Sequence, residues 1–573
     1  MIKGLILENF KAFSNRTEVN INDLTIISGT NSSGKSTIIQ ALLLLKQTLE
    51  NSDEKIVLDY GGRFVKFSNF NEIVFGRKEK QSFKIGFILE NDMDNPFIFA
   101  NETNHFRSIT VETKTEIIIE FISKKENVFI KSIIYKKHYE NYGTTEYKFL
   151  HDKFTWNLKI NCFNHPNENL DDLSIRNLNF EITRMLEKPS YKKEEEYKFN
   201  LQKKIDINSI EEKFHKFGFS IQAIPDFGEK LFDELQNNET ILNDFEEDDL
   251  EKFFNKLLLY TFLKKINLNT SGLLLNTSHF LIDTRFANVL SRSLSVLIRV
   301  FHDTFGYESR EIYSFLKGIE YLGPYRVGPE RAYINFGNPN EIKPTGENSI
   351  QFLWRFRRMQ IENKIGIFEK RNIQSLESAT QDWLNYLDLT DNFLVSRIKG
   401  LVYESKIESQ KGSNLYVSLA DVGYGFSQLL PVILIGLKSK KNQLIIIEQP
   451  ELHLHPKLQG KLAEFFLCLI QMGKKVLIET HSEHLINMVR LKIVLDSVNE
   501  LNKKVIILFV RRKLKQNNGI SENNLAGSIL ETLLIDPFGK IIDWPPDFFP
   551  EGIEIHEEIL SAILEKHSKE ANK

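Results

Sequence analysis

A stretch near the start of the chain has residue types and spacing that suit phosphate binding. It fits the pattern Gly-x-x-x-x-Gly-Lys-Ser/Thr of a phosphate-binding loop. The stretch comprises Gly29, Thr30, Asn31, Ser32, Ser33, Gly34, Lys35, Ser36 and Thr37. Its glycines let the backbone wrap closely around an anion, which the free N–H groups of a helix start also attract. The sequence therefore predicts a nucleotide site, with Lys35 on the β- and γ-phosphates and Ser36 on Mg²⁺.

Two further chemical elements follow apolar runs near the other end of the chain. Glu448 ends the run 443–447, and an acid at the end of a buried strand beside the phosphate loop can hold Mg²⁺ directly or through water. His481 follows the run 475–478, from which an imidazole can reach the γ-phosphate. The alternative for His481 alone is an ordinary histidine at a strand end. Its place after the other two elements favours the functional role.

The elements that must position these residues lie at both ends of the chain. An apolar, β-branched run at 24–28 predicts a buried strand before the loop, and 38–46 predicts a mostly buried helix after it. After residue 440, continuous apolar strands alternate with helices, which indicates a parallel sheet covered on both faces. The predicted fold class is therefore α/β.

Five segments are predicted along the chain. Residues 1–90 and 401–573 form two lobes of a nucleotide-binding head, and 318–400 lead back into it. Between them, 91–164 alternate apolar and polar residues and predict a β-meander, whereas 165–317 show helical spacing with dense charge and predict a helical insertion. Local predictions are short strands at 55–58, 64–67 and 83–89, and helices at 349–363, 374–387 and 426–437.

Composition excludes several classes of protein. The 573 residues are 41% hydrophobic and 26% charged, as in soluble globular proteins. Two cysteines, Cys162 and Cys468, indicate neither a disulfide framework nor a zinc site. The N-terminus lacks the layout of a signal peptide, and no apolar run approaches the length of a membrane span, so we expect a cytoplasmic protein. The net charge of −3 does not support wholesale nucleic-acid binding, so any DNA or RNA contact needs a local patch.

Several of these motifs together resemble one known group of ATPases. They are Leu7–Phe13, Gly29–Thr37, Glu448–Glu451 and Thr480–Ser482. With them, the chain resembles the ABC-type ATPase heads of the SMC, RecF and OLD group, over roughly residues 1–90 and 415–490. The resemblance implies a P-loop ABC-type head split in sequence, with an inserted β-meander and helical region. It also implies ATP and Mg²⁺ as ligands, with Lys11 among the ATP-binding residues.

In this group two heads enclose two ATP molecules, so the resemblance implies a homodimer. The phosphate loop of one head faces a signature segment of the other, and the counterpart here is 421–428. Gly423 takes the place of the group's serine, and Gly425 and Ser427 follow it. Backbone N–H groups at this helix start can bind a γ-phosphate in trans. The alternative is a plain helix N-terminus.

Three other sequence motifs are similar to those of a narrower bacterial branch of these ATPases. It consists of Leu452–Pro456, Tyr321–Pro324 and Asp543–Pro545. ATPases of this branch occur in anti-phage defence systems, Septu-type ATPases among them. The resemblance implies a separate effector protein, a nuclease, as partner, because the tail after His481 shows no metal-carboxylate cluster of its own.

Gln449 departs from the group's pattern, in which a second acid follows the strand-end acid and orients the attacking water. An amide cannot accept the proton of that water, and loss of a general base commonly costs about 10²–10⁴ in rate. Either Glu451 or His481 takes over this role, or hydrolysis is slow and ATP serves as a clamp. The alternatives to an ATPase switch are therefore a nucleotide-gated scaffold with little hydrolysis, and an ATPase of DNA repair or chromosome structure.

The sequence does not assign a single role to three other groups of residues. His453 and His455 form a His-x-His pair, but no third ligand has suitable spacing for a metal. Arg326 and Arg331 follow a Gly-Pro turn and can contact phosphate, a partner's acid or a surface acid. The basic runs at 438–441 and 511–515 are either solvated faces or part of a DNA path.

Overall fold

The computed structural model describes most of the two ends of the chain. It describes residues 1–163 and 307–545, apart from gaps at 52–55, 78–80, 92–96, 101–105, 110–112, 125–126, 140–142, 153–154, 335–339, 399, 401, 409–411, 414, 497, 499, 513–526 and 544. The predicted helical insertion lies outside the described residues except for its last helix, α8 (Tyr307–Lys317). That helix agrees with the prediction for this part of the chain.

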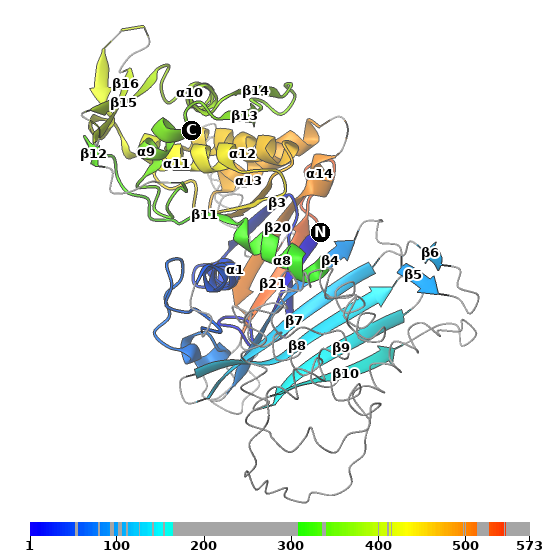
Figure 1. Ribbon diagram of the computed structural model, residues 1–573. Helices are drawn as coiled ribbons and strands as arrows, with labels where there is room; N and C mark the ends of the chain where they lie inside the picture. Colours follow the sequence, from blue (N-terminus) through cyan, green and yellow to red (C-terminus); the bar gives the residue numbers. More distant parts are fainter. Residues whose placement is uncertain are drawn as a thin grey trace, which may run out of the picture.

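A six-stranded sheet joins the two ends of the chain (Figure 1). Its strands, in spatial order, are β11 (Glu320–Leu322), β18 (Leu444–Glu448), β19 (Lys475–Glu479), β3 (Leu24–Gly29), β20 (Val505–Arg512) and β21 (Ser528–Leu534). The first five are parallel, and β21 pairs antiparallel with β20 at the edge. Strand β3 therefore hydrogen-bonds on both sides to strands from the far end of the sequence. This confirms an α/β head that is split in sequence.

Both faces of the parallel sheet are buried, as the continuous apolar runs predict. In β18, Ile445 and Ile447 belong to one core and Leu444 and Ile446 to another. The first core packs under helices of the return segment and of the second lobe. These are α9 (Ser349–Phe356), α10 (Leu376–Tyr386), α11 (Tyr424–Lys438), α12 (Pro456–Gln471) and α13 (Glu483–Val494). The second core contains α1 (Lys35–Glu50) and α8.

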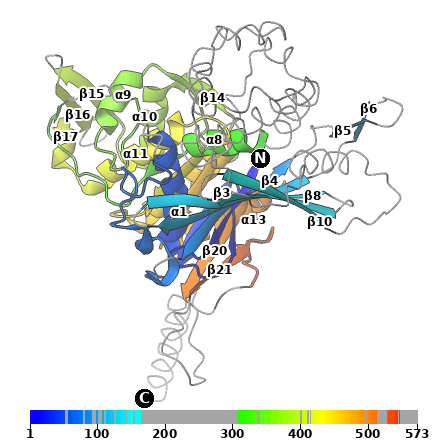
Figure 2. The same ribbon diagram turned by 60° about the horizontal axis from the view of Figure 1, so that its bottom comes forward.

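A seven-stranded antiparallel sheet closes the second core (Figure 2). Its strands, in spatial order, are β10 (Thr155–Phe163), β9 (Gly143–Asp152), β8 (Asn127–Tyr139), β7 (Thr113–Lys124), β4 (Ser82–Asn91), β1 (Ile2–Glu8) and β2 (Thr17–Asn20). Successive strands from β7 to β10 pair with one another, which confirms the predicted β-meander. A separate hairpin joins β5 (Phe97–Ala100) and β6 (Phe106–Ile109).

The return segment and the start of the second lobe also form small antiparallel sheets. One contains β12 (Tyr333–Ile334), β16 (Val402–Glu408), β15 (Phe393–Ile398) and β17 (Tyr416–Ser418), and another contains β13 (Gln360–Asn363) and β14 (Asn372–Ser375). The helix predicted over 349–363 is therefore too long. It ends at Phe356, because 360–363 pair with 372–375 instead.

The short strands predicted at 55–58 and 64–67 are wrong for the described residues there, which contain no strand. The side chain of Gln47, on α1, supplies the backbone hydrogen bonds that a neighbouring strand would otherwise make. Its amide nitrogen donates to the carbonyls of Asp59 and Val65 at 2.5 and 3.0 Å, and its amide oxygen accepts from the N–H groups of Phe64 and Val65 at 3.1 and 2.9 Å. Backbone polar groups need partners when buried, and one buried glutamine supplies them here.

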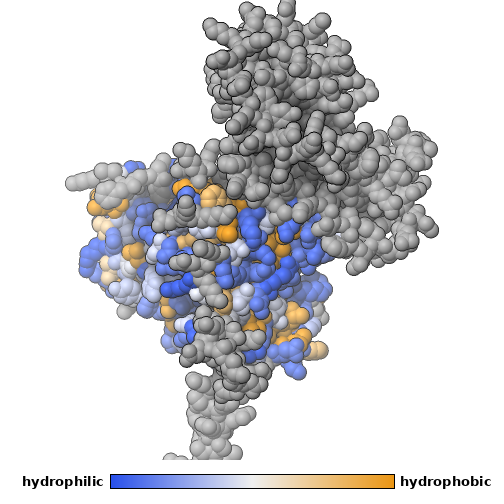
Figure 3. Space-filling view, turned by 90° about the horizontal axis from the view of Figure 1, so that it is seen from below, coloured by the Kyte–Doolittle hydropathy of each residue, from blue (hydrophilic) through white to orange (hydrophobic). Residues whose placement is uncertain are grey.

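The surface of the described part is mostly hydrophilic on the face seen in Figure 3, with apolar residues in small scattered groups. Within the described ranges, none of the helices combines the length and the apolar character that crossing a membrane requires.

Candidate functional site

The predicted phosphate loop lies between β3 and α1, and both of its glycines are structurally required. Gly29 has φ +142°, and a Cβ there would lie 2.0 Å from the carbonyl oxygen of Val510 on β20. Gly34 has φ +104°, and a Cβ there would lie 2.5 Å from the Cβ of Ala12. These φ values also disfavour any L side chain. The turn therefore packs too closely against segments from both ends of the chain to accept a side chain at either position.

A cavity of about 850 Å³ opens above this loop. Of the residues predicted to bind ATP or act in catalysis, it is lined by Lys11, Asn31, Ser32, Ser33, Gly34, Lys35, Ser36, Thr37, Gln449 and His481. Its remaining walls include Gln40, Phe67, Glu72, Arg77 and Glu479. The structure thus brings the phosphate loop, the residue after β18 and the histidine after β19 to one site. Gly29, Glu448, Glu451 and the signature glycines do not line it.

Lys35 is buried within the loop. Its ammonium donates to the carbonyls of Gly29 at 3.0 Å and Thr30 at 2.7 Å. Burial lowers the pKa of this ammonium, and the nearby charge of Glu479 opposes that shift. The ammonium holds two loop carbonyls from inside, and the N–H of Ser33 donates to the carbonyl of Thr30 at 3.3 Å. The helix start that follows can attract an anion.

Strands from the far end of the sequence brace the loop. Arg512, at the end of β20, donates to the carbonyl of Ser32 at 3.0 Å. The hydroxyl of Ser528, at the start of β21, donates to the carbonyl of Ser33. Sequence reasoning missed both contacts, because nothing in the local pattern ties positions nearly 500 residues apart. Arg511, in the same basic run, is paired with Glu531 at 2.8 Å.

The order of strands corrects one expectation about the acids. Glu448 was expected beside the phosphate loop, but β19 lies between β18 and β3. The acid that reaches the loop is Glu479, at the end of β19, whose Oε1 accepts a hydrogen bond from Ser36 Oγ at 3.1 Å. Burial raises the pKa of Glu479, while Ser36 and Lys35 favour its charged form. Glu479 was not among the predicted site residues.

Glu448 instead belongs to a cluster with the segment that returns to the head. Its Oε1 accepts from the hydroxyl of Tyr321 at 2.7 Å. The guanidinium of Arg326 donates to the backbone carbonyls of Glu448 and Gln449, at 2.7 and 3.4 Å. Burial raises the pKa of Glu448 to about 7, and the charge of Glu479 adds to the rise, whereas Tyr321 and Arg326 oppose it.

The two arginines after the Gly-Pro turn have different environments. Arg326 is only 8% exposed and donates to the backbone at the end of β18. This is none of the contacts expected for it. Burial lowers its pKa to about 10. Arg331 forms an exposed ion pair with Asp421 at 3.1 Å, which is the surface contact expected for it.

Gln449, Glu451 and His481 meet at the ends of the two acidic strands. Gln449 has φ 44°, and its N–H donates to the carbonyl of Glu479 at 2.7 Å. Glu451 is buried, and its Oε1 accepts from the backbone N–H of His481 at 2.7 Å. Partial burial in the cavity wall lowers the pKa of the His481 imidazole, and Lys35 lowers it further. The imidazole is therefore neutral at pH 7, able to accept or to donate a hydrogen bond.

The signature segment lies outside the cavity. Gly423 precedes α11, and a Cβ placed on it would meet nothing within 4 Å. Tyr424 is 62% exposed, and Ser427 donates to the carbonyl of Tyr424 at 2.8 Å. No side chain caps this helix start. The first N–H groups of a helix have no intrahelical partner, so an uncapped helix start can donate to a ligand held by another molecule.

The residues at the loop fit a Mg²⁺ ion that is held together with a nucleotide. Mg²⁺ in such sites takes one or two protein oxygens and completes its shell with phosphates and water. Ser36 and Glu479 supply a hydroxyl and a carboxylate at this place. No set of three His, Cys, Asp or Glu side chains in the described part is arranged to hold a metal by itself, and His453 and His455 belong to none.

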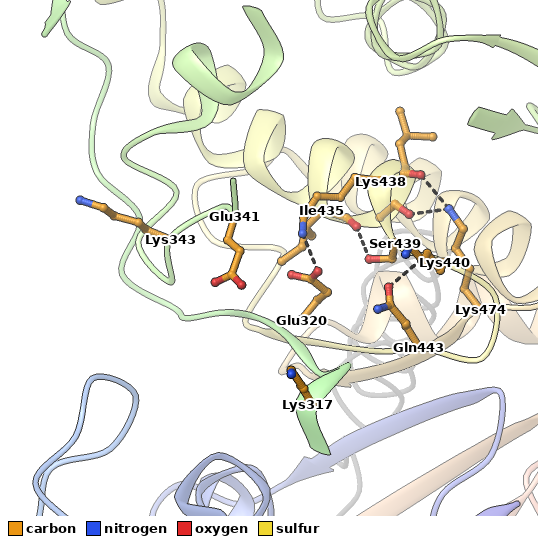
Figure 4. Close-up of polar contacts among 12 residues, drawn as sticks. Lys317, Glu320, Glu341, Lys343, Ile435, Lys438, Ser439, Lys440, Gln443 and Lys474 are labelled. Carbon is orange, nitrogen blue, oxygen red and sulfur yellow. Dashed lines mark hydrogen bonds and ion pairs between the residues drawn. The ribbon is translucent and has the colours of Figure 1, made fainter. Parts of the chain in front are cut away.

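The basic run 438–441 is partly used in structural contacts (Figure 4). Lys438 pairs with Glu320, and its side chain is only 8% exposed. Ser439 donates to a carbonyl one turn earlier in α11. Lys474 approaches from the start of β19 and donates to two carbonyls in the last turn of α11, at 2.8 and 2.9 Å. Lys438 and its neighbours thus stabilise a helix end, which favours the structural interpretation of this run over a DNA path.

Comparisons with known proteins agree with this site. The family model described as AAA ATPase domain matches residues 1–270 and 327–486, about three quarters of the chain. No curated protein matches the chain. Among solved structures, the SMC head domain from Thermotoga maritima aligns over 93% of this chain and 99% of its own, at 8% identity with a TM-score of 0.31.

Another similar structure is the Smc head domain from Pyrococcus furiosus, with an extended coiled coil and bound to the C-terminal domain of ScpA. It aligns over 97% of this chain and 99% of its own, at 12% identity with a TM-score of 0.31. At these TM-scores the alignments do not establish a shared arrangement of elements.

Proposed function

The chain belongs to the AAA ATPase domain family, and on that premise we propose that it is an ATPase that binds ATP with Mg²⁺ and hydrolyses it slowly. One observation carries the proposal. The phosphate loop, Gln449 and His481 line a single cavity at the end of a parallel sheet. This is the place where nucleotides bind in sheets of this kind, beside a glycine-rich turn and a helix start.

Each residue has a distinct task in this proposal. The N–H groups of residues 31–36 bind the phosphates, and Lys35 supplies a fixed positive charge. Ser36 holds the Mg²⁺ that neutralises the phosphates. Neutral His481 donates a hydrogen bond to the γ-phosphate, and Glu451 fixes its backbone. Gln449 positions water but cannot take its proton, so catalysis is slow.

We propose that a second copy of the chain completes the site. Support comes from the start of α11, which does not line its own chain's cavity and has no side-chain cap. A phosphate held on one copy can accept hydrogen bonds from this helix start on the other. ATP then joins two heads, and its release separates them. The resemblance to ABC-type heads favours the same arrangement.

Phosphate release and nucleotide binding test the proposal together. We expect slow turnover from the purified protein, and loss of both binding and turnover in Lys35→Ala. Lys457→Ala removes an exposed lysine and is the matched control. Gln449→Glu restores an acid and is expected to raise turnover at least about tenfold. Failure to bind ATP would overturn the proposal.

A nucleotide-gated scaffold is the second candidate, and Gln449 is the observation that favours it. In that case ATP binds and the chain dimerises, as seen by light scattering, but no phosphate is released above the level of Lys35→Ala. Turnover that depends on Lys35 and falls in Glu451→Gln would exclude the scaffold.

We also propose a role in anti-phage defence with a separate effector nuclease. Its support is the similarity of Leu452–Pro456 and Tyr321–Pro324 to a bacterial branch of such ATPases. The test is the plating efficiency of phage on bacteria that express the chain with the product of its neighbouring gene. Protection that is lost in Lys35→Ala is expected, and absence of protection with every neighbouring gene would contradict it.

A further inference from the structure

The peptide groups of the phosphate loop must keep a fixed direction to bind an anion. In a trans peptide the C=O and the N–H point to opposite sides, so a peptide that turns over presents phosphate with a repelling carbonyl in place of a donor. The backbone of the loop does not prefer its own conformation. Ser32 has φ 58° and Gly34 has φ 104°, both in the left-handed region, which a serine adopts only at a cost. Contacts from outside are therefore needed to hold the loop.

The carbonyls of the loop are held from two sources. Lys35 donates to the carbonyls of Gly29 and Thr30, at 3.0 and 2.7 Å. This lysine belongs to the motif itself, so the start of the loop supplies its own donor. The carbonyls of Ser32 and Ser33 instead accept from the hairpin of β20 and β21. The direction of the middle of the loop thus depends on the far end of the sequence.

One cross-strand pair supplies both of these donors. Arg512 on β20 and Ser528 on β21 lie directly opposite each other in the hairpin. Arg512 Nε donates to the Ser32 carbonyl at 3.0 Å, and Ser528 Oγ donates to the Ser33 carbonyl. Because the Ser33 carbonyl points to the hairpin, the N–H of Gly34 in the same peptide group points away from it. Gly34 lines the cavity, whereas Arg512 and Ser528 do not.

The hairpin is fixed to the head by contacts other than these two. Strand β20 pairs with β3 as far as Val510, which lies opposite Gly29. The N–H of Ser528 donates to the carbonyl of Ala12 at 2.8 Å. The hairpin is thus in place before any ligand binds, which is what a support for a precise binding site requires.

We propose that Arg512 and Ser528 are positioning residues for phosphate binding. They keep the carbonyls of Ser32 and Ser33 turned toward the hairpin, and they act through the loop backbone without touching the nucleotide. This inference rests on the proposed ATP site and names the part of the chain that sets its affinity. The ligand group concerned is the phosphate chain and not the base, so ATP and inorganic triphosphate should depend on the pair alike.

Calorimetric titration of the full chain with ATP, and separately with inorganic triphosphate, tests the proposal. Arg512→Ala is expected to weaken both ligands about 3–10-fold, the loss that follows from one hydrogen bond. The double variant with Ser528→Ala should weaken them about 10–100-fold. Arg512→Lys keeps a donor and should recover part of the affinity. Arg511→Ala is the matched control, because it removes the same side chain one residue earlier, where it pairs with Glu531 at 2.8 Å.

Two further measurements separate positioning from a loss of stability. Arg512 is exposed, so Arg512→Ala should leave the denaturation midpoint of the nucleotide-free protein unchanged. In steady-state turnover its KM for ATP should rise while kcat is retained, because saturating ATP restores the loop. If Ser528→Ala does not fold, Arg512→Ala against Arg511→Ala decides.

Three results would overturn the inference. They are an unchanged affinity in Arg512→Ala, an equal loss in Arg511→Ala, and a loss for ATP that inorganic triphosphate does not share. A wild-type chain that binds neither ligand is a different result, because it overturns the proposed function itself and the inference with it.

Discussion

Strands β18 and β19 both end in glutamate, at positions directly opposite one another, yet the two acids have different surroundings. Glu448 is enclosed by Tyr321 and Arg326, which come from the segment that returns to the head. Glu479 faces the phosphate loop through Ser36 and keeps one oxygen unpaired. Residue type and position at a strand end are the same, so the neighbouring strands and loops must set the role.

The comparison shows that strand order decides which acid lies directly against the phosphate loop. Strand β19 is the direct neighbour of β3, so its end lies against the loop that follows β3. Strand β18 is one position further away and is covered by β11 and the turn after it. The end of β18 thus connects the nucleotide site, through Gln449, to the return segment. The end of β19 contacts the site directly.

The largest expected effect comes from removing Arg326, which holds the end of β18 together. Arg326→Ala removes the donor to two backbone carbonyls and a buried charge near Glu448 and Glu451. We expect the free energy of unfolding to fall by about 3 kcal/mol. Arg331→Ala is the matched control, because its ion pair with Asp421 is exposed and should be worth at most about 1 kcal/mol. Chemical denaturation measures both, and equal losses would contradict the assigned role of Arg326.

Much of the head could be predicted from local sequence. Apolar runs between turns are typical of buried strands, and β3, β18 and β19 lie where such runs predict them. The phosphate loop was predictable because its chemistry requires fixed residue types at fixed spacing. His481 and Gln449 were placed near it by their order along the chain. The structure confirms that both line the same cavity.

The rest depended on contacts between distant parts of the chain. A run of apolar residues predicts a strand but not its neighbours, so the position of β19 between β18 and β3 was not readable. Gln47 replaces a strand by bonding two loop segments with one side chain, and local propensity contains no sign of this. Likewise, Ser528 and Arg512 brace the loop from nearly 500 residues away. These contacts follow from tertiary packing, which overrides local preference.

A smaller effect is expected from the charge of Glu448, and it depends on pH. Its pKa is raised from 4.5 to about 7 in the folded chain, so the folded state binds a proton more tightly than the unfolded state. Stability from this group is therefore complete below about pH 4.5 and is lost as the pH rises to 7. Glu448→Gln removes this dependence. The variant should gain on the order of 2 kcal/mol over the wild type at pH 8 and nothing near pH 4.5.

Denaturation midpoints of the nucleotide-free protein in EDTA, compared between pH 4.5 and 8, measure this difference. Because Glu451 and Glu479 titrate in the same direction, only the difference between wild type and variant is interpreted. A difference that does not change with pH would show that Glu448 is not held in this environment.

The smallest expected effect tests the hydrogen bond between Tyr321 and Glu448. Tyr321→Phe removes a donor that favours the charged carboxylate, so the pKa of Glu448 should rise further above its wild-type value. One such bond is worth about 1 kcal/mol, which corresponds to somewhat less than one pKa unit. The loss of stability should be largest at pH 8, where Glu448 is charged, and small near pH 5. Nucleotide affinity should hardly change, because Tyr321 does not line the cavity.

The matched comparison is Tyr321→Phe in the background of Glu448→Gln, where the pH dependence of the loss should disappear. If instead Tyr321→Phe lowered stability equally at pH 5 and pH 8, the bond would not act through the charge of Glu448. If the loss of stability follows the charge of Glu448 alone, the end of β18 is an acid cluster held by the return segment, distinct from the contact of Glu479 with Ser36 at the phosphate loop.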